Sequence, residues 1–353
     1  MKVLVTGVGG GGHGEQILKA LRLSTLNYTI VGADMSAISK GLVNVDIPYL
    51  LPPASDPSYT DKLIALCKKH DVKAVFHGSE PELKVMNHNR VQIEAAGLFL
   101  PINPSTVIDT CMDKFKTVEF LIANGFKFPI SARITSKSDL DNIDFMPVVL
   151  KPSVGGGGSA NIMLAQTREE LQVFGQYLLT MYDEFIVQEY VGTPDNEFTV
   201  GVLSSMDGEL INSIAVKRMI LTSLSNRIKA PNRTGKAGLG KILAISSGVS
   251  QGEIGVFREV TAPCEKIAVR LGSCGAINIQ CRYVDGEVYV FEINPRFSGT
   301  TSLRAMVGYN EPDILIRKHL LGEEIKPFFE YKTGYILRGL EESYIHTLNI
   351  ESI

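Results

Sequence analysis

The sequence predicts an α/β fold followed by an α+β fold, and three observations carry that prediction. The first hundred residues alternate short apolar runs with helical stretches, which is typical of a parallel sheet with crossover helices. The next hundred contain closely spaced strands, which favour antiparallel sheet. Prolines interrupt the pattern at "PINPSTV" between the two. A chain of 353 residues is also long enough for two or three domains.

The first part is expected to be a Rossmann-like domain over residues 1–108. Its strands are expected at "KVLVTG", "TIVGAD", "DIPYLL" and "KAVFHGS", with helices starting near Glu15 and Tyr59. After the prolines a new helix is expected from about Asp113.

The second part has strand patterns at "MPVVLKP", "ANIMLA", "EFIVQEYV", "EFTVGVL" and "ELINSIAVKR". Between about Met219 and Gly252 the chain is rich in Gly, Ser, Asn and Lys, which indicates a long loop of the kind that often covers an active site. A helix through "EVTAPCEKIAVRLG", a strand pair at "GAINIQCRYV" and "EVYVFEINPR", a helix from about Pro312 to Leu321 and a strand near "GYILRGL" complete the pattern.

Composition places the chain among soluble globular proteins, with 44% hydrophobic and 21% charged residues. A net charge of −3 gives no electrostatic reason to expect nucleic acid or a membrane as partner. No apolar stretch reaches transmembrane length, and no secretory leader is recognised. The five cysteines are odd in number and form no CxxC pair, so we expect a reducing cytoplasm. A homodimer is the default expectation for a soluble enzyme.

The first of two four-glycine runs follows a strand and precedes a helix. Gly7, Gly9 and Gly12 satisfy GxGxxG, and Asp34 ends the next strand where a ribose-binding acid would stand. These residues alone predict NAD and an NAD-dependent oxidoreductase. A tight structural turn, or a loop that holds a second substrate, accounts for them as well.

The second run, in "KPSVGGGGSAN", lies between two strands, with Lys151 at its entrance. Such a flap can close over phosphates, because glycine backbone approaches an anion closely. Farther on come "FIVQEYVG", "NEFTVGV", "NIQ" and "FEINPR". In this order the motifs resemble the ATP-grasp superfamily, most closely the ATP-grasp units of the large chain of carbamoyl-phosphate synthase and its stand-alone relatives. The resemblance implies a small ATP-grasp subdomain with the glycine flap over 109–192 and a large subdomain over 193–353. It also implies a preceding domain of a kind that does not usually bind a dinucleotide.

The resemblance also implies a set of nucleotide-binding residues. Lys114 and Lys151 would touch the phosphates of ATP, while Gly156 and Gly157 would close over them. Glu189 and Val191 would form the hinge that reads adenine, and Glu197 would bind the ribose. From their place at a strand end, Lys217 and Arg218 are further phosphate candidates, with solvent as the alternative.

Catalysis is implied to depend on magnesium and cations. Gln280, Glu292 and Asn294 match the family's Mg²⁺ ligands, with Mn²⁺ as an alternative metal, and Arg296 matches the arginine that steadies the transferring phosphoryl group together with Lys151. Hard oxygen donors suit Mg²⁺. Phosphoryl transfer needs charge neutralisation and alignment more than a protein nucleophile.

The expected activity is an ATP-dependent ligase that joins a small-molecule carboxylate to an amine or a related nucleophile through an acyl phosphate, releasing ADP and phosphate. A non-catalytic nucleotide-binding module is a further alternative. Gly299 stands where the family often has a second arginine, which favours a carboxylate other than bicarbonate. Candidate substrate residues are His13, Ser79, Glu80 and Glu82.

The final strand pair allows a prediction of register. Polar and apolar residues alternate in "AINIQCRY" and in "VYVFEIN". A two-residue turn would place Gln280 opposite Phe291, with the polar residues of the two strands on opposite faces. A three-residue loop that ends in a left-handed Gly286 would place Asn278 opposite Glu292 and gather the polar residues on one face. We therefore expect the three-residue loop, with Gln280 and Glu292 converging on one cleft.

Overall fold

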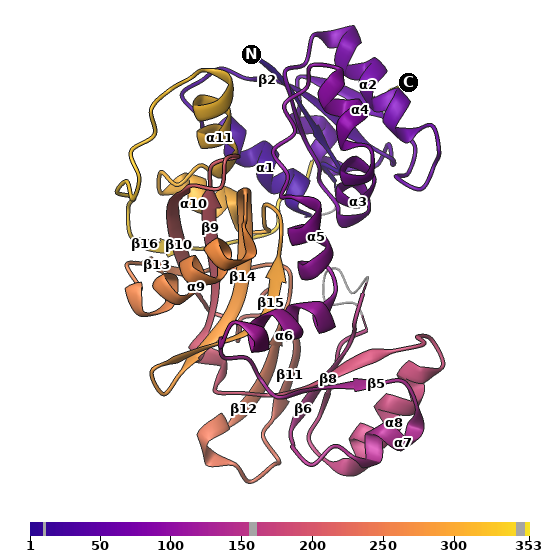
Figure 1. Cartoon of the computed structure of the whole chain (residues 1–353), viewed down its shortest axis with the longest axis vertical. Helices are drawn as coiled ribbons and strands as arrows, with labels where there is room; N and C mark the ends of the chain where they lie inside the picture. The colour runs from indigo at the N-terminus through magenta and orange to yellow at the C-terminus, as the bar shows by residue number, and fades with distance from the viewer. Residues whose placement is uncertain (10–11, 155–160, 344–349) are drawn as a thin grey trace.

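The computed structural model describes residues 1–9, 12–154, 161–343 and 350–353. Three sheets follow one another along the long axis of the molecule (Figure 1). A parallel sheet lies at one end, a six-stranded antiparallel sheet in the middle, and a four-stranded antiparallel sheet at the other end. The predicted fold class is confirmed. Both chain ends lie beside the parallel sheet.

The parallel sheet has the order β17-β3-β2-β1-β4. Its strands are β1 (Lys2–Thr6), β2 (Thr29–Asp34), β3 (Ile47–Leu50), β4 (Ala74–Phe76) and β17 (Glu351–Ser352). The last strand returns from the end of the chain to pair with β3, which no sequence pattern indicated. Its helices are α1 (His13–Arg22), α2 (Tyr59–His70), α3 (Glu80–His88) and α4 (Arg90–Ala95).

The four-stranded sheet has the order β5-β8-β6-β7, and all its pairs are antiparallel. It contains β5 (Ser131–Ile134), β6 (Val148–Pro152), β7 (Met163–Ala165) and β8 (Phe185–Glu189). The helices α7 (Lys137–Asp141) and α8 (Arg168–Leu179) pack on it, while α5 (Ser105–Cys111) and α6 (Lys114–Ala123) precede it. The side chain of Asp113 caps α6 by accepting from the N–H groups of Phe115 and Lys116.

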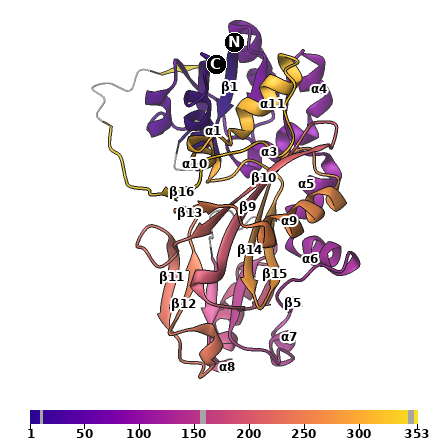
Figure 2. The same ribbon diagram turned by 90° about the vertical axis from the view of Figure 1, so that its left-hand side faces the viewer.

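The six-stranded sheet has the order β15-β14-β9-β10-β13-β16. Its strands are β9 (Glu197–Ser204), β10 (Leu210–Arg218), β13 (Gly252–Gly255), β14 (Gly275–Val284), β15 (Glu287–Asn294) and β16 (Gly334–Ile336). The helix α9 (Arg258–Leu271) packs on one face. The helices α10 (Thr301–Met306) and α11 (Glu311–Leu320) follow β15 and lie toward the parallel sheet (Figure 2).

The region from 219 to 252 is not the long irregular loop that its composition predicted. It contains a two-stranded antiparallel sheet, β11 (Asn226–Pro231) and β12 (Ile242–Ser246). The inward side chains of this sheet pack with Tyr190 and Leu164, and the Tyr190 hydroxyl accepts from the backbone N–H of Ala244 at 2.9 Å. Burial of alternate apolar residues therefore outweighs the loop-like composition.

The register predicted for the β14–β15 hairpin is wrong. Val284 pairs with Glu287, so the turn has two residues, Asp285 (φ 51°) and Gly286 (φ 83°). The positive φ of Gly286 is confirmed. A bulge then shifts the register between Gln280 and Cys281. As a result Gln280, and not the predicted Asn278, pairs with Glu292.

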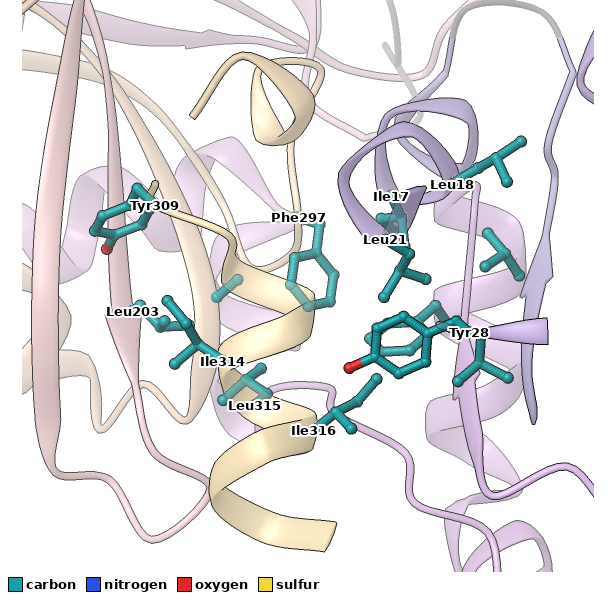
Figure 3. Packing of buried hydrophobic residues seen from close by; sticks show 14 of the residues in the cluster. Ile17, Leu18, Leu21, Tyr28, Leu203, Phe297, Tyr309, Ile314, Leu315 and Ile316 are labelled. Atoms are coloured by element: carbon teal, nitrogen blue, oxygen red, sulfur yellow. The ribbon is translucent and has the colours of Figure 1, made fainter. Parts of the chain in front are cut away.

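One continuous core joins the parallel sheet to the six-stranded sheet (Figure 3). Ile17 and Leu21 of α1 lie on one side, Leu315 of α11 and Leu203 of β9 on the other, and Phe297 lies among them. Polar bonds reinforce the contact, since Asn310 donates to the carbonyl of Ala20 at 2.7 Å. The segment after β15 is thus held against the N-terminal helix. Among the described residues, no helix is long and apolar enough to cross a membrane.

Candidate active site

A cavity opens where the four-stranded sheet faces β14, β15 and the β11–β12 pair. Its wall also includes Glu80 from the start of α3, so the N-terminal part of the chain contributes to it as well. The lining includes most of the residues that the sequence nominated: Glu80, Lys114, Lys151, Glu189, Val191, Glu197, Gln280, Glu292, Asn294 and Arg296.

Lys151 connects two sheets at the floor of this cavity. It lies at the end of β6, and its ammonium donates to Gln188 Oε1 at 2.8 Å and to the carbonyl of Phe291 at 3.0 Å. Phe291 is the residue at the bulge, which turns both Phe291 and Glu292 toward the cavity. Burial lowers the pKa of Lys151 to about 7, while Glu292 raises it and Lys114 lowers it. The ammonium is therefore short of negative charge until an anion arrives.

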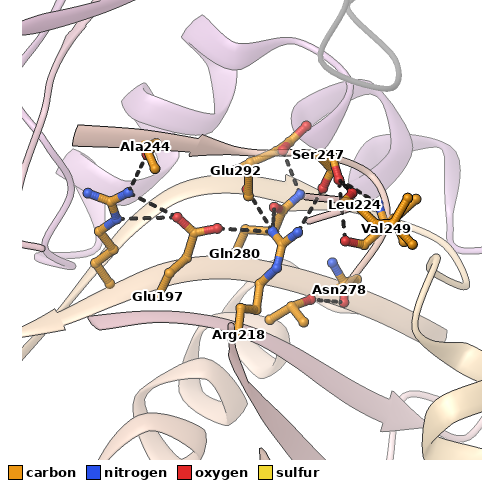
Figure 4. Close-up of polar contacts among 12 residues, drawn as sticks. Glu197, Arg218, Leu224, Ala244, Ser247, Val249, Asn278, Gln280 and Glu292 are labelled. Atoms are coloured by element: carbon orange, nitrogen blue, oxygen red, sulfur yellow. Dashed lines mark hydrogen bonds and ion pairs between the residues drawn. The ribbon is translucent and has the colours of Figure 1, made fainter. Parts of the chain in front are cut away.

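Glu197 lies between two guanidinium groups (Figure 4). One carboxylate oxygen accepts from Arg218 Nη1 at 3.0 Å, and the other accepts from Arg282 Nη2 at 3.1 Å. All three side chains are almost completely buried. Arg282 also donates to the carbonyls of Val191 and Ala244, both at 3.0 Å, which fixes the hinge against β12. The predicted ribose ligand is thus part of a rigid charged cluster at the cavity wall.

The three predicted metal ligands lie on the cavity side of β14 and β15. Gln280 Nε2 donates to Glu292 Oε2 at 2.6 Å, and Asn278 pairs with Asn294 across the strands. One carboxylate and two amide oxygens are hard donors that fit Mg²⁺, with nucleotide phosphates and water completing the shell. Within the described residues there is no group of three His, Cys, Asp or Glu that could hold a metal, so this mixed set is the candidate.

Arg296 links the metal-ligand strand to the N-terminal part. Its Nη2 donates to Asn294 Oδ1 at 3.0 Å and forms an ion pair with Glu80 Oε1 at 3.1 Å. Its Nε is buried and has no hydrogen-bond partner within the part of the chain that the structure describes. Of the four substrate candidates, Glu80 is the one that lines the cavity.

Lys114 and the hinge complete the cavity. The N–H of Lys114 donates to the carbonyl of Ser153 at 3.2 Å, which places the start of α6 beside the end of β6. Glu189 ends β8 and Val191 follows it, both at the cavity. Gly156 and Gly157 lie outside the described residues, and so does most of the loop to which they belong.

Several nominated residues lie elsewhere. Lys217 is not part of the lining, and its neighbour Arg218 is. Glu82 and Ser79 stabilise the turn after β4, because Glu82 Oε2 accepts from the N–H of Gly78 at 3.1 Å and from the Ser79 hydroxyl at 2.9 Å. His13 lies 3.3 Å from His77, measured from Nε2 to Nδ1, and burial lowers the pKa of both, to about 3 for His77.

Asp34 is engaged with its own loop rather than turned toward an open pocket. One of its oxygens accepts from the N–H of Gly9 at 2.9 Å and the other from the N–H of Ser36 at 3.1 Å. Gly7 has φ +55°, and a Cβ on Gly9 would lie 2.4 Å from Ser39 Cβ, so both positions require glycine. The GxGxxG pattern therefore has a structural reason in this turn.

Sequence reasoning did not assign Arg282 and Asn278 to the site, and it named Arg218 together with Lys217 without distinguishing the two. Side chains on a strand alternate between faces, and β9 pairs Phe198 with Lys217, so Arg218 lies opposite Glu197. Phe198 belongs to the core, so the polar face carries Glu197 and Arg218. The parity of Glu197 was the signal that could have selected Arg218 over Lys217.

Comparison with known proteins agrees with this geometry. A model of the ATP-grasp domain matches residues 111–300, and a model of the PylC-like N-terminal domain matches residues 3–100. The chain belongs to the ATP-grasp family. The match to the ATP-grasp domain includes β14 and β15, which carry the candidate metal ligands, and it also includes Lys114 and Lys151.

Individual ATP-grasp relatives are distant. The large chain of carbamoyl phosphate synthase from Thermoplasma volcanium is 24% identical over 296 residues, covering 82% of this chain and 26% of that protein. The chain thus spans about a quarter of that relative. The D-alanine--D-alanine ligase of Leptospira biflexa is 24% identical over 347 residues, with 89% of this chain and 97% of that one covered. The solved L-amino acid ligase from Bacillus licheniformis has a TM-score of 0.62 at 19% identity, with 92% and 77% covered.

Proposed function

We propose that this protein is an ATP-dependent carboxylate–amine ligase that acts through an acyl phosphate. The observation that carries the proposal is the convergence of Lys151, Lys114 and Arg296 with Glu292 in one cavity. The cavity lining holds five cationic side chains, those of Lys114, Lys151, Arg218, Arg282 and Arg296, and four carboxylates, those of Glu80, Glu189, Glu197 and Glu292. The excess of positive charge suits the phosphates of a nucleotide and a substrate carboxylate. Relatives named as ligases of amino acids support an amino acid as a substrate.

In the first step a carboxylate oxygen of the substrate attacks the γ-phosphorus of ATP, and the bond to the ADP oxygen breaks. Lys151 holds the phosphate chain and Arg296 orients the attacking carboxylate, since its Nε is unpaired within the described residues. Mg²⁺, when held by Gln280, Glu292 and Asn294, neutralises the charge on the phosphates.

In the second step the amine attacks the acyl carbon, and phosphate leaves with the former carboxylate oxygen. The amine must lose a proton, and Glu80 is the candidate acceptor because its carboxylate lines the cavity beside Arg296, the residue that orients the substrate carboxylate. The products are an amide, ADP and phosphate.

Trapping with hydroxylamine tests the proposal. The protein is incubated with MgATP and a panel of carboxylates without amine, and hydroxamate and ADP are measured. We expect carboxylate-dependent hydroxamate in equal amount to ADP, with loss of both in Glu292→Gln. ADP release without hydroxamate, or no carboxylate-dependent release across the panel, would contradict an acyl-phosphate ligase.

A further inference from the structure

A buried ion pair contacts a residue that lines the candidate site. Arg304 of α10 and Glu311 of α11 are both completely buried, and Arg304 Nη1 donates to Glu311 Oε1 at 3.0 Å. The other terminal nitrogen of Arg304, Nη2, donates to Oδ1 of Asn278 on β14 at 2.6 Å. The guanidinium lies over Gly201 of β9, where a Cβ would be 2.2 Å from Arg304 Nη1. The absence of a side chain at Gly201 therefore leaves the space in which Arg304 reaches Asn278.

The contact with Arg304 decides which way the Asn278 amide points. A guanidinium only donates, so the Asn278 atom that accepts from it must be the oxygen. The Thr199 hydroxyl donates to the same oxygen at 2.9 Å. The amide nitrogen makes no hydrogen bond within the described residues, and it is not among the buried side-chain atoms that lack a partner there. Because Asn278 lines the cavity, this nitrogen is open to the cavity.

Asn278 lies between the candidate metal ligands and the arginine assigned to the substrate. It precedes Gln280 by two residues on β14, so both side chains lie on the same face of the strand (Figure 4). Across the strands its partner is Asn294. Arg296 Nη2 donates to Asn294 Oδ1 at 3.0 Å. The open donor of Asn278 is thus at the end of the cavity where Arg296 orients the reacting carboxylate.

We propose that the Asn278 amide nitrogen donates a hydrogen bond to the reacting carboxylate, and that the Arg304–Glu311 ion pair positions this amide. The Asn278 oxygen already accepts two hydrogen bonds, so it is not available to a metal. Without Arg304 the amide can turn and present either its oxygen or its nitrogen to the cavity. With Arg304 the donor is oriented before the substrate arrives, which is what stabilises an oxyanion most effectively. This inference rests on the proposed ligase function.

Asn278→Asp separates the donor from the contacts around it. Aspartate keeps an oxygen that accepts from Arg304 and Thr199, and it replaces the NH₂ group by a charged oxygen. Kinetic constants come from the hydroxamate assay with MgATP and a carboxylate that the unmodified protein accepts. We expect Asn278→Asp to lower kcat/KM for the carboxylate by about 100-fold. An unchanged kcat/KM would show that Asn278 only holds the sheet and α10 together.

Asn278→Ala tests the alternative that Asn278 binds the metal. It should lower kcat/KM for the carboxylate by about 10- to 100-fold, as expected for the loss of one hydrogen bond to a charged group. The KM of ATP and the Mg²⁺ concentration needed for half-maximal rate should stay unchanged. An increased Mg²⁺ requirement would make Asn278 a metal ligand and overturn its assignment to the carboxylate.

A double-mutant cycle tests the positioning role. Arg304→Met combined with Glu311→Gln removes both buried charges together, and glutamine still accepts from the Thr301 hydroxyl. We expect this double substitution to lower kcat/KM for the carboxylate by about 10- to 100-fold in the unmodified protein. It should have no further effect when Asn278 is already alanine. Additive losses would show that the ion pair does not act through Asn278.

Arg317→Met combined with Asp313→Asn is the matched control, because this ion pair lies on α11 and neither residue lines the cavity. It should leave kcat/KM unchanged. If no carboxylate yields hydroxamate, the ligase proposal fails separately, and the side-chain amide signal of Asn278 decides. That signal is identified in ¹H–¹⁵N spectra by its loss in Asn278→Asp, and MgADP is added with each carboxylate. A shift that the Arg304 and Glu311 substitutions abolish supports the site, and an equal shift or none overturns it.

Discussion

Replacing Lys151 by methionine should stabilise the protein while removing its activity. Burial lowers the pKa of this lysine from 10.5 to about 7. Near neutral pH, protonation of Lys151 is therefore less favourable in the native state than in the unfolded chain. By linkage, that difference costs roughly 5 kcal/mol of stability at pH 7. Methionine has a similar length and carries no charge, so the cost disappears.

The substitution also has a cost. Gln188 Oε1 and the Phe291 carbonyl lose their donor, each at about 1–2 kcal/mol. The balance is a net stabilisation of about 1–3 kcal/mol at pH 7. Activity should fall by about 10²- to 10³-fold, as when one preorganised donor is removed from a reaction site.

The pH dependence isolates the charge. Because the native pKa lies below the unfolded one, the unfolded chain binds more protons between pH 7 and 10.5, and the stability of the unmodified protein rises with pH across that window. The stability of Lys151→Met does not rise in this way. The ratio of its folding equilibrium constant to that of the unmodified protein should therefore fall by about tenfold for each pH unit, until the unmodified protein becomes the more stable of the two.

Urea midpoints followed by circular dichroism at pH 7, 8 and 9 measure the difference, with ADP release measured in parallel. The exposed Lys116→Met is the control and should show no such trend. A difference between Lys151→Met and the unmodified protein that stays constant over these pH values would refute the desolvation of Lys151.

Two other substitutions follow from buried charges. Glu197→Gln leaves Arg218 and Arg282 without their shared carboxylate and should lower the free energy of unfolding by about 3–5 kcal/mol, and a loss below about 1 kcal/mol in urea would contradict the cluster. His77 and His13 are buried with lowered pKa values, so stability should fall as pH drops below 6.5, where the unfolded chain gains protons first. His77→Asn should flatten the fall between pH 6 and 4, and an unchanged slope would count against it.

Much of the fold could be predicted because its signals are local. The apolar runs at β1, β2 and β4 and the turn residues between them specify parallel strands, and the structure has them as expected. The β11–β12 pair could not be recognised, because its stability comes from packing on Tyr190, far away in the chain. The return of β17 to β3 likewise depends on a contact between segments that lie far apart in the sequence, since Glu351 pairs with Tyr49.

The candidate site shows where pattern reasoning stops. If side chains alternate strictly along β15, Phe291 must face the core when Glu292 faces the cavity. Under that assumption, only a three-residue loop places the polar side chains of β14 and β15 on the same face. The chain instead keeps the tight turn at Asp285 and Gly286 and inserts one extra residue into β15, so that Val290 and Ile293 stay in the core while Phe291 and Glu292 both face the cavity. A bulge leaves no mark in an apolar and polar pattern. The bulge also shapes the candidate site, because the carbonyl of the bulged residue, Phe291, accepts a hydrogen bond from the ammonium of Lys151.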